Sequence, residues 1–142
     1  MQYKIINIKT SKSQKASMGA LSVFEGTHDI PFEIKRIYYI CGTKTGVKRG
    51  MHAHKTTDQM LICLQGKICI NLDDGLSQYH VTLDNPSVGL FLPACYWHDM
   101  VWEDENSILL VAASDYYNED DYIRDYSSFL DYYGKRECKH GG

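Results

Sequence analysis

The distribution of apolar residues along the chain predicts short β-strands. FEIKRIYYI, from Phe32 to Ile40, is rich in β-branched and aromatic residues, and MLICLQGKICINL contains two apolar runs interrupted at Gly66. Two further runs, NPSVGLFLP and NSILLVAAS, are bounded by Pro, Asn and Ser. Asp74-Gly75 is a strong signal for a hairpin turn. Short strands with turn residues at this spacing predict an all-β sandwich or barrel.

The C-terminal part of the chain has a different pattern. Apolar residues between Ile123 and Tyr133 recur at helical spacing, and Asn118 is a suitable N-terminal cap. We therefore expect a helical segment over about residues 118–134, after a β core over about residues 5–115. No internal repeat or low-complexity linker divides the chain, which predicts a single domain over residues 1–142.

Composition narrows the class of protein. Hydrophobic content of 44% and charged content of 23% are ordinary for a globular domain, and the net charge of −3 argues against a nucleic-acid binder. The first residues, MQYKIINIKTSKSQ, lack the apolar core of a signal peptide, and no apolar run approaches the span of a bilayer. We expect a cytoplasmic protein without a membrane or nucleic-acid partner.

The segment RGMHAHK carries the most distinctive candidate chemistry. His52 and His54 are two residues apart, so on a strand they project from the same face, and Arg49 precedes them at a turn. Together with His98 they offer three nitrogens for Zn²⁺ or Fe²⁺ with open positions. Without a metal, the two imidazoles suit proton transfer near neutrality, and an arginine beside them suits an enolate oxygen. A solvent-facing pair of histidines is the third interpretation.

The spacing around these histidines resembles a known family. Five residues resemble the first cupin motif, namely Gly46, His52, His54, Gln59 and Gly66, although cupins usually have Glu at the fourth place. Pro93, Cys95 and His98 match the second cupin motif loosely. The resemblance implies a double-stranded β-helix, or jelly roll, of two antiparallel sheets around a ligand cavity. Because Gln59 removes the anionic ligand that a divalent cation prefers, we predict neither a metal nor any other cofactor.

Four segments narrow the resemblance. IPFEIKRIYYI, RGMHAHK, VGLFLPACYWHDM and ASDYYNEDDYIRDYSSF together resemble the dTDP-4-keto-6-deoxy-D-glucose 3,4-ketoisomerases, over about Ile5 to Tyr133. The resemblance implies an isomerase of deoxysugar biosynthesis that moves a ketone from C4 to C3 of a dTDP-linked sugar through an enediolate. It also implies that His52 and His54 are the catalytic pair that carries the protons.

The same resemblance implies roles in substrate binding. Arg49 is expected to face the diphosphate or the oxyanion, Gln59 to steady a histidine or bind a sugar hydroxyl, and His98 to enter the cavity from the opposite sheet. Strict alternation in FEIKRIYYI puts Arg36 and Tyr39 on opposite faces, so only one of them enters the cavity. We select Tyr39 as the sugar contact and keep Arg36 as the second candidate, for the diphosphate.

The family divides by the configuration left at C4 of the product. The residues near Met18 and at His98 are those that resemblance associates with this division. His98 resembles the branch that forms the galacto product, whereas Met18 stands where that branch tends to have Arg. The galacto product is our expectation from this pattern.

Other roles and functions stay open from the sequence. Arg124 and the tyrosine-rich segment 116–126 either pack a C-terminal helix against the barrel or close over the pocket. The rival functions are a sugar-nucleotide 3,5-epimerase, a metallo-cupin oxygenase or isomerase, and a non-catalytic cupin that binds a nucleotide sugar. Family resemblance also implies a homodimer formed by sheet extension.

Overall fold

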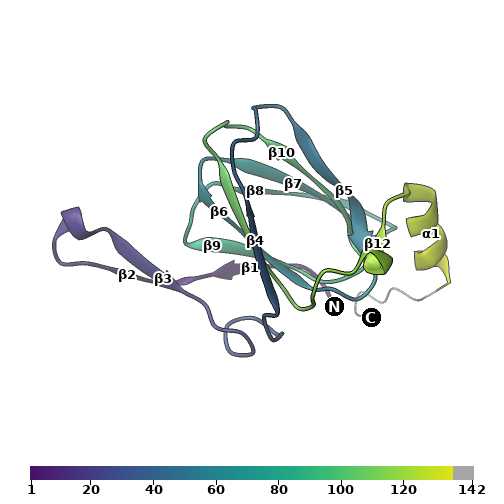
Figure 1. Ribbon diagram of the computed structural model, residues 1–142, viewed down its shortest axis with the longest axis horizontal. Helices are drawn as coiled ribbons and strands as arrows, with labels where there is room; N and C mark the ends of the chain where they lie inside the picture. Colours follow the sequence, from purple (N-terminus) through teal and green to yellow (C-terminus); the bar gives the residue numbers. More distant parts are fainter. Residues whose placement is uncertain (136–142) are drawn as a thin grey trace.

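Two five-stranded antiparallel sheets face each other in the computed structural model, which describes residues 1–135 (Figure 1). One sheet has the strand order β1-β9-β6-β11-β4 and the other has the order β12-β5-β10-β7-β8. The strands are β1 (Lys4–Asn7), β2 (Lys9–Lys12), β3 (Ala20–Val23), β4 (Arg36–Ile40), β5 (Lys48–His54), β6 (Gln59–Gln65), β7 (Ile68–Asp73), β8 (Gln78–Leu83), β9 (Val88–Leu92), β10 (Trp97–Trp102), β11 (Ile108–Ala113) and β12 (Tyr122–Ile123). The predicted all-β architecture of two packed antiparallel sheets is confirmed.

The main core lies between the two sheets and follows the period of two that strands impose. On β7, Ile68, Ile70 and Leu72 are at most 1% exposed, whereas Cys69 and Asn71 between them are only partly buried. Trp102 of β10 is fully buried in the same cluster. Burial of these large apolar side chains stabilises the pairing of the sheets and fixes the register of each strand, because a slip of one residue would expose them.

The hairpin between β7 and β8 forms where the sequence predicts it. Asp74 donates its backbone N–H to the carbonyl of Ser77 over 3.1 Å, and Gly75 adopts a φ of 90°. A Cβ at Gly75 would also lie 2.8 Å from the ring of Tyr133. Glycine is therefore required here both by the turn and by the contact with the C-terminal helix.

The helical segment predicted over about residues 118–134 is wrong for its first half. The α-helix α1 spans Tyr126–Gly134 and is capped by the carboxylate of Asp125. Asn118 does act as a cap, but for a single 3₁₀ turn, η2 (Glu119–Asp121). The next two residues form β12, which pairs antiparallel with the end of β5. Pairing with an open sheet edge and burial of Ile123 against Phe129 outweigh the helical spacing in this stretch.

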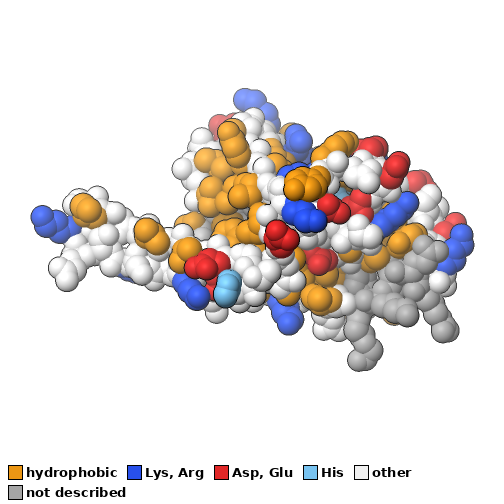
Figure 2. Space-filling view, turned by 60° about the horizontal axis from the view of Figure 1, so that its bottom comes forward, with side chains coloured by type: hydrophobic (Ala, Val, Ile, Leu, Met, Phe, Trp, Pro, Cys, Tyr) orange, Lys and Arg blue, Asp and Glu red, His pale blue; other side chains and the backbone are white. Residues whose placement is uncertain are grey.

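A two-stranded arm projects from the body of the molecule and was not predicted. It consists of β2, the 3₁₀ turn η1 (Ala16–Met18) and β3, and extends sideways from the sheets (Figure 1). Its apolar side chains are open to solvent, with Met18 71% and Leu21 65% exposed. Figure 2 shows these hydrophobic side chains along the arm. Within residues 1–135 of a single chain, no other segment covers these side chains.

The remaining segment before β4 covers part of the outer face of the first sheet. Ile30 and Phe32 pack there against Met60 and Phe91, in a second apolar cluster. Within residues 1–135, no helix has the length and apolar character to cross a membrane.

Candidate active site

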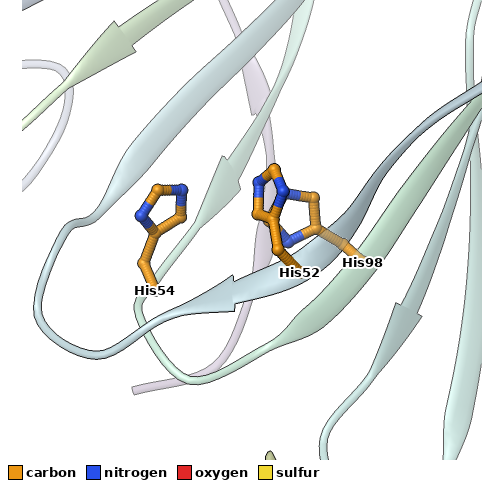
Figure 3. Close-up of side chains that lie close together, drawn as sticks. All are labelled: His52, His54 and His98. Carbon is orange, nitrogen blue, oxygen red and sulfur yellow. The ribbon is translucent and has the colours of Figure 1, made fainter. Parts of the chain in front are cut away.

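Three histidines meet between the sheets at one end of the barrel (Figure 3). His52 and His54 project from the same face of β5, as predicted, with ring centroids 5.2 Å apart. His98 lies 4.8 Å from the ring of His52 and 6.1 Å from that of His54. The prediction that it enters from the opposite sheet is wrong, because β10 pairs with β5 in the same sheet. His54 and His98 are each 3% exposed. A solvent-facing pair is therefore ruled out.

A β-bulge in β5 sets the position of His52. Across the β5–β10 pair, His98 is opposite His52 but Asp99 is opposite Gly50, so Met51 is an extra residue on β5. Met51 adopts a φ of 61°, which costs a non-glycine residue roughly 1–2 kcal/mol. A Cβ at Gly50 would lie 3.1 Å from the backbone oxygen of His98. The bulge and the close approach of the two strands bring His52 next to His98.

Burial keeps two of the imidazoles neutral. Desolvation, helped by the neighbouring His54, lowers the pKa of His52 to about 4. Desolvation, with both neighbouring imidazoles, holds the pKa of His98 well below its usual range. The Nδ1 of His98 lies 3.1 Å from the backbone oxygen of Tyr96, which accepts its hydrogen and leaves Nε2 as the free atom. At neutral pH, His52 and His98 are therefore both uncharged and each keeps a nitrogen with a free lone pair.

His54 is held by a carboxylate that the sequence analysis did not identify. Asp121 of η2 accepts a hydrogen bond from Nδ1 of His54 over 2.9 Å. Burial alone would raise the pKa of Asp121, but hydrogen bonds from His54, Thr57 and Thr56 outweigh it and hold the pKa below its usual range. The one available signal was Asp121 itself, which the helical pattern assigned to the first turn of a helix. Only the return of the chain to β5 brings it to His54.

The histidines border a cavity of about 440 Å³, a size typical of small-molecule sites. Its lining comes from β4, β5, β10 and the C-terminal segment, and consists of Arg36, Tyr38, Ile40, Arg49, Gly50, His52, Met100, Tyr117, Tyr122 and Arg124. Of the three histidines His52 lines this space, and the rings of His54 and His98 lie 5.2 and 4.8 Å from that of His52. Among the described residues, three arginines and no carboxylate line this space. Arg124 is paired with Glu119, so the positive charge that favours an anionic ligand comes mainly from Arg36 and Arg49.

Of the two candidates on strand β4, Arg36 and not Tyr39 faces the cavity. Alternation holds, and Arg36, Tyr38 and Ile40 face the cavity. Tyr39 points away from it and is 70% exposed, so its selection as the sugar contact was wrong. The predicted alternation itself contained the signal for Tyr38, because a strand that turns Arg36 inward turns Tyr38 inward as well.

The side chain of Gln59 hydrogen-bonds Tyr38, whereas the prediction had it steady a histidine or bind the sugar. Its Nε2 donates to the hydroxyl of Tyr38 over 3.0 Å, and its side chain is 2% exposed. Burial raises the pKa of Tyr38 to about 12, so the phenol stays protonated at neutral pH. The structure thus presents the Tyr38 hydroxyl in the cavity in a fixed position, as a neutral donor.

The tyrosine-rich segment forms a wall of the cavity. Tyr122 of β12 lies 4.4 Å from the ring of His54 and 5.1 Å from that of His52. Arg124 lies 4.3 Å from the Tyr122 ring and binds Glu119 through two nitrogens, at 2.6 and 3.0 Å. Tyr126, in contrast, packs against Trp97. Of the two predicted roles, closure over the pocket holds for Tyr117, Tyr122 and Arg124, and helix packing holds for Tyr126.

Met18 lies outside the site of its own chain. It ends η1, between β2 and β3, on the arm that projects away from β5 and β10 (Figure 1). Arg49, in contrast, lines the cavity as predicted. A role for Met18 near the sugar would require the arm to reach the cavity of another molecule.

The donor set fits a metal ion poorly. The spacing of the three histidines is compatible with an ion, since their nearest nitrogens lie within 4.8 Å of one another and tetrahedral zinc holds its ligands roughly 3.4 Å apart. The charge is less suitable, because Gln59 is neutral where the usual fourth ligand is a carboxylate. Arg36, Arg49 and Arg124 line the adjoining space and would repel a cation. The charge of the site therefore suits an anion better than a divalent metal.

Comparisons with known proteins agree with the geometry. A family model described as "FdtA: WxcM-like, C-terminal" matches residues 1–134. A TDP-4-oxo-6-deoxy-alpha-D-glucose-3,4-oxoisomerase of Aneurinibacillus thermoaerophilus is 44% identical over 135 residues, covering 95% of each chain. The 3,4-ketoisomerase structure from Helicobacter canadensis is 44% identical, with a TM-score of 0.87, and covers 92% of this chain and 96% of that one.

A further solved structure contains a nucleotide sugar. It is a mutant of the 3,4-ketoisomerase QdtA from Thermoanaerobacterium thermosaccharolyticum, with asparagine in place of a histidine, in complex with TDP-4-keto-6-deoxyglucose. It is 39% identical with a TM-score of 0.89, and covers 96% of this chain and 97% of that one. A dTDP-4-dehydrorhamnose 3,5-epimerase from Bacillus anthracis is only 15% identical, with a TM-score of 0.73, covers 84% of this chain and 76% of that one, and shares the fold alone.

Proposed function

Because the chain belongs to the FdtA family of sugar 3,4-ketoisomerases, we propose that it converts dTDP-4-keto-6-deoxy-D-glucose to a dTDP-3-keto-6-deoxyhexose. The observation that carries this proposal is the pairing of His52 and His54 with a cavity lined by Arg36, Arg49 and Arg124. Proton carriers and an anion-binding surface are the two things that this reaction requires of a protein.

The reaction needs a base, a proton donor and stabilisation of an oxyanion. The hydrogen at C3 of the substrate is acidic because it lies next to the C4 ketone. Its removal gives an enediolate with the negative charge on O4. O4 then takes a proton, the O3 hydroxyl loses one, and protonation at C4 leaves the ketone at C3 and a hydroxyl at C4. Atoms and electrons balance within the substrate, so the protein needs only to move protons and to stabilise negative charge.

His52 and His54 are the proposed proton carriers. His52 lines the cavity, and its lowered pKa keeps it neutral, and thus able to accept a proton, at neutral pH. The ring of His54 lies 5.2 Å from that of His52, with Nδ1 occupied by Asp121 and Nε2 unpaired among the described residues. The protonated hydroxyl of Tyr38 is a suitable donor to an oxygen of the enediolate. The side chain of Gln59 supports the reaction by fixing that hydroxyl.

The arginines are the proposed diphosphate contacts. Nε of Arg36 is buried and has no partner among the described residues, although the guanidinium lies 5.7 Å from the rings of both Tyr38 and Tyr117. A buried donor without a partner costs free energy that a phosphate oxygen would recover. Arg49 and Arg124 lie around the same opening. Guanidinium groups in this arrangement suit bidentate contacts with phosphate.

NMR of the product formed from dTDP-4-keto-6-deoxyglucose in D₂O tests the proposal. We expect a ketone at C3 and deuterium at C4. Deuterium at C3 and C5 with the ketone still at C4 would instead identify a 3,5-epimerase. Substrate that is bound but unchanged after long incubation would identify a non-catalytic binding protein, and activity that depends on added metal would favour a metallo-cupin.

We also propose that the product has the galacto configuration at C4. His98 supports this, because its Nε2 is left free by the bond from Nδ1 to Tyr96 and it lies beside His52 at the reacting end of the cavity. The coupling constants of the sugar ring protons, measured in H₂O on the product, distinguish the galacto from the gluco configuration. A gluco product would overturn this assignment and leave the ketoisomerase proposal intact.

A homodimer is the proposed assembly. Two apolar surfaces support it: the arm, with Met18 and Leu21 exposed, and the outer side of β4, where Ile37 and Tyr39 are 60% and 70% exposed. Exposed apolar surface of this kind is typical of an interface. Light scattering at several concentrations should give the mass of two chains, and Leu21→Glu should lower it. A wild-type protein with the mass of one chain would contradict this proposal.

We propose a cytoplasmic location, because the proposed substrate is charged. A nucleoside diphosphate sugar carries negative charges that prevent it from crossing a bilayer, so the enzyme must act where the nucleotide sugar is made. Fractionation of cells with an antibody against the untagged protein tests this.

A further inference from the structure

Asp121 makes the one carboxylate contact that the histidine cluster receives within residues 1–135. We infer that Asp121 is a positioning residue of the ketoisomerase reaction, which fixes the orientation and tautomer of His54 through its Nδ1. This inference rests on the proposed function, because it concerns how one of the proposed proton carriers works.

The carboxylate of Asp121 is itself held rigidly. Its Oδ2 accepts from Nδ1 of His54 over 2.9 Å and from the hydroxyl of Thr57 over 2.6 Å. Its Oδ1 accepts from the backbone N–H and the hydroxyl of Thr56, at 2.7 and 2.9 Å. The side chain is 9% exposed. Four donors from two elements leave the carboxylate no freedom to rotate, so it can transmit a fixed direction to the imidazole.

This contact determines which nitrogen of His54 can exchange protons. An ionised carboxylate only accepts hydrogen bonds, so Nδ1 of His54 must carry a hydrogen. In the neutral ring, Nε2 then holds the lone pair. That atom is buried and has no partner among the described residues, which leaves it free for the substrate or for exchange with His52. Without Asp121 the ring could adopt the other tautomer, with the lone pair directed away from the cavity.

The surroundings make Asp121 the main electrostatic influence on His54. His52 on the same strand and His98 on β10 both face it and are kept neutral by burial. From β12 the ring of Tyr122 lies 4.4 Å away, and beyond it Arg124 and Glu119 neutralise each other in an ion pair. The charge in direct contact with His54 is therefore that of Asp121, which stabilises the imidazolium that forms whenever Nε2 takes a proton.

The test compares Asp121→Asn with the wild-type full-length protein. We expect kcat to fall by about 10- to 100-fold with KM little changed, as is usual when the partner of a functional imidazole is lost. The loss should remain after the rate is corrected for the fraction of folded protein, measured by circular dichroism. A purely structural role would lower that fraction and leave the rate per folded molecule unchanged.

NMR of ¹⁵N-labelled histidine gives a second readout that needs no turnover. In the wild type, His54 should carry its hydrogen on Nδ1 when neutral, and in Asp121→Asn the tautomers should mix. A wild-type His54 with its hydrogen on Nε2 would overturn the inference even if the variant failed to fold. So would an Asn variant with an unshifted tautomer and wild-type kcat.

Asp58→Asn is the matched control. Asp58 lies just before β6 and accepts from the backbone N–H of Ala94 over 2.9 Å, a bond that serves the backbone and not a histidine. Its substitution should leave the His54 tautomer and kcat unchanged. A wild-type protein that did not isomerise the sugar would overturn the proposed function, whereas the tautomer measurement would still decide the role of Asp121.

Discussion

Two cavities of nearly equal size lie on opposite faces of the sheet around β10, and they differ in charge and in hydrogen bonding. The inner one, of about 440 Å³, receives Arg36, Arg49 and Arg124. The outer one, of about 430 Å³, is lined by Asn71, Leu72, Asp73, Gln78, His80, Trp97, Asp99 and Tyr126. Strand alternation separates them, since β10 turns His98 and Met100 inward and Trp97 and Asp99 outward.

The outer cavity is a set of polar groups that already satisfy one another. Asp73 accepts from the hydroxyl of Tyr126 over 2.7 Å, and Asp99 accepts from Asn71 over 2.7 Å. Asn71 in turn bonds His80. In the inner cavity, by contrast, buried nitrogens of Arg36, His52 and His54 lack partners in the described structure. The comparison teaches that unsatisfied, correctly charged groups identify the reactive site, whereas volume does not.

The largest effect on activity is expected from replacing a histidine in one cavity and comparing it with the same replacement in the other. His52→Asn and His54→Asn should each lower kcat/KM by about 10²- to 10⁴-fold, the usual contribution of a general acid or base. His80→Asn in the outer cavity should leave it unchanged. Initial rates of ketone migration, with circular dichroism as a check on folding, measure the effect. Full turnover in both inner variants would refute the assigned role of the pair.

A smaller effect is expected from removing one charge on each side. Arg36→Gln should raise KM and weaken dTDP binding by about 10- to 100-fold, because hydrogen bonds to charged groups contribute about 1.5–3 kcal/mol. Asp99→Asn in the outer cavity should change neither. Calorimetric titration with dTDP gives the dissociation constants. Equal affinity in wild type and Arg36→Gln would remove Arg36 from the diphosphate site.

The third test uses pH. Folding lowers the pKa of His52 from 6.5 to about 4, so the unfolded chain takes up this proton first as the pH falls. Stability should therefore decline between about pH 6.5 and 4, by about 1–2 kcal/mol from this group once its partial exposure is allowed for. Urea unfolding at several pH values measures it. His52→Asn should flatten the decline, while His80→Asn, which alters a solvated side chain, should not.

The smallest expected effect is on the stability of the fold, when Met51 at the bulge of β5 is replaced. Met51→Gly should stabilise the fold by up to about 1 kcal/mol, because glycine adopts the observed φ of 61° without steric cost, although part of the gain is lost to chain entropy. Met51→Val should destabilise it, since a β-branched residue tolerates this φ least. Thermal unfolding of both variants tests this. A loss of stability in Met51→Gly would show that the Met51 side chain itself matters at the bulge.

The sequence contained enough information for the parts of the structure that depend on local order. Alternation and turn residues predicted the strands from β6 to β9 and the hairpin at Asp74-Gly75. The separation of His52 and His54 placed both on one face, and motif resemblance added His98. The inferences from alternation use neighbours along one strand, and strand geometry fixes their relation wherever the strand lies.

The errors and omissions concern relations between distant segments. The choice of Tyr39 over Arg36 was wrong because alternation tells which residues share a face but not which face is turned inward. The helix expected from residue 118 gave way to β12 because the edge of β5 was available for pairing. Met18 was associated with the site, yet it lies on an arm that leaves the body of the chain.

The amino-acid sequence by itself determined the class of fold, the histidine pair and the family, since these depend on spacing along the chain. Only the tertiary structure decided three contacts. Asp121 accepts a hydrogen bond from His54, Gln59 donates one to Tyr38, and the arginines line one cavity. Residues 67 positions apart meet only when the C-terminal segment returns to β5. Such a meeting is determined by the packing of the whole chain, which no local pattern encodes.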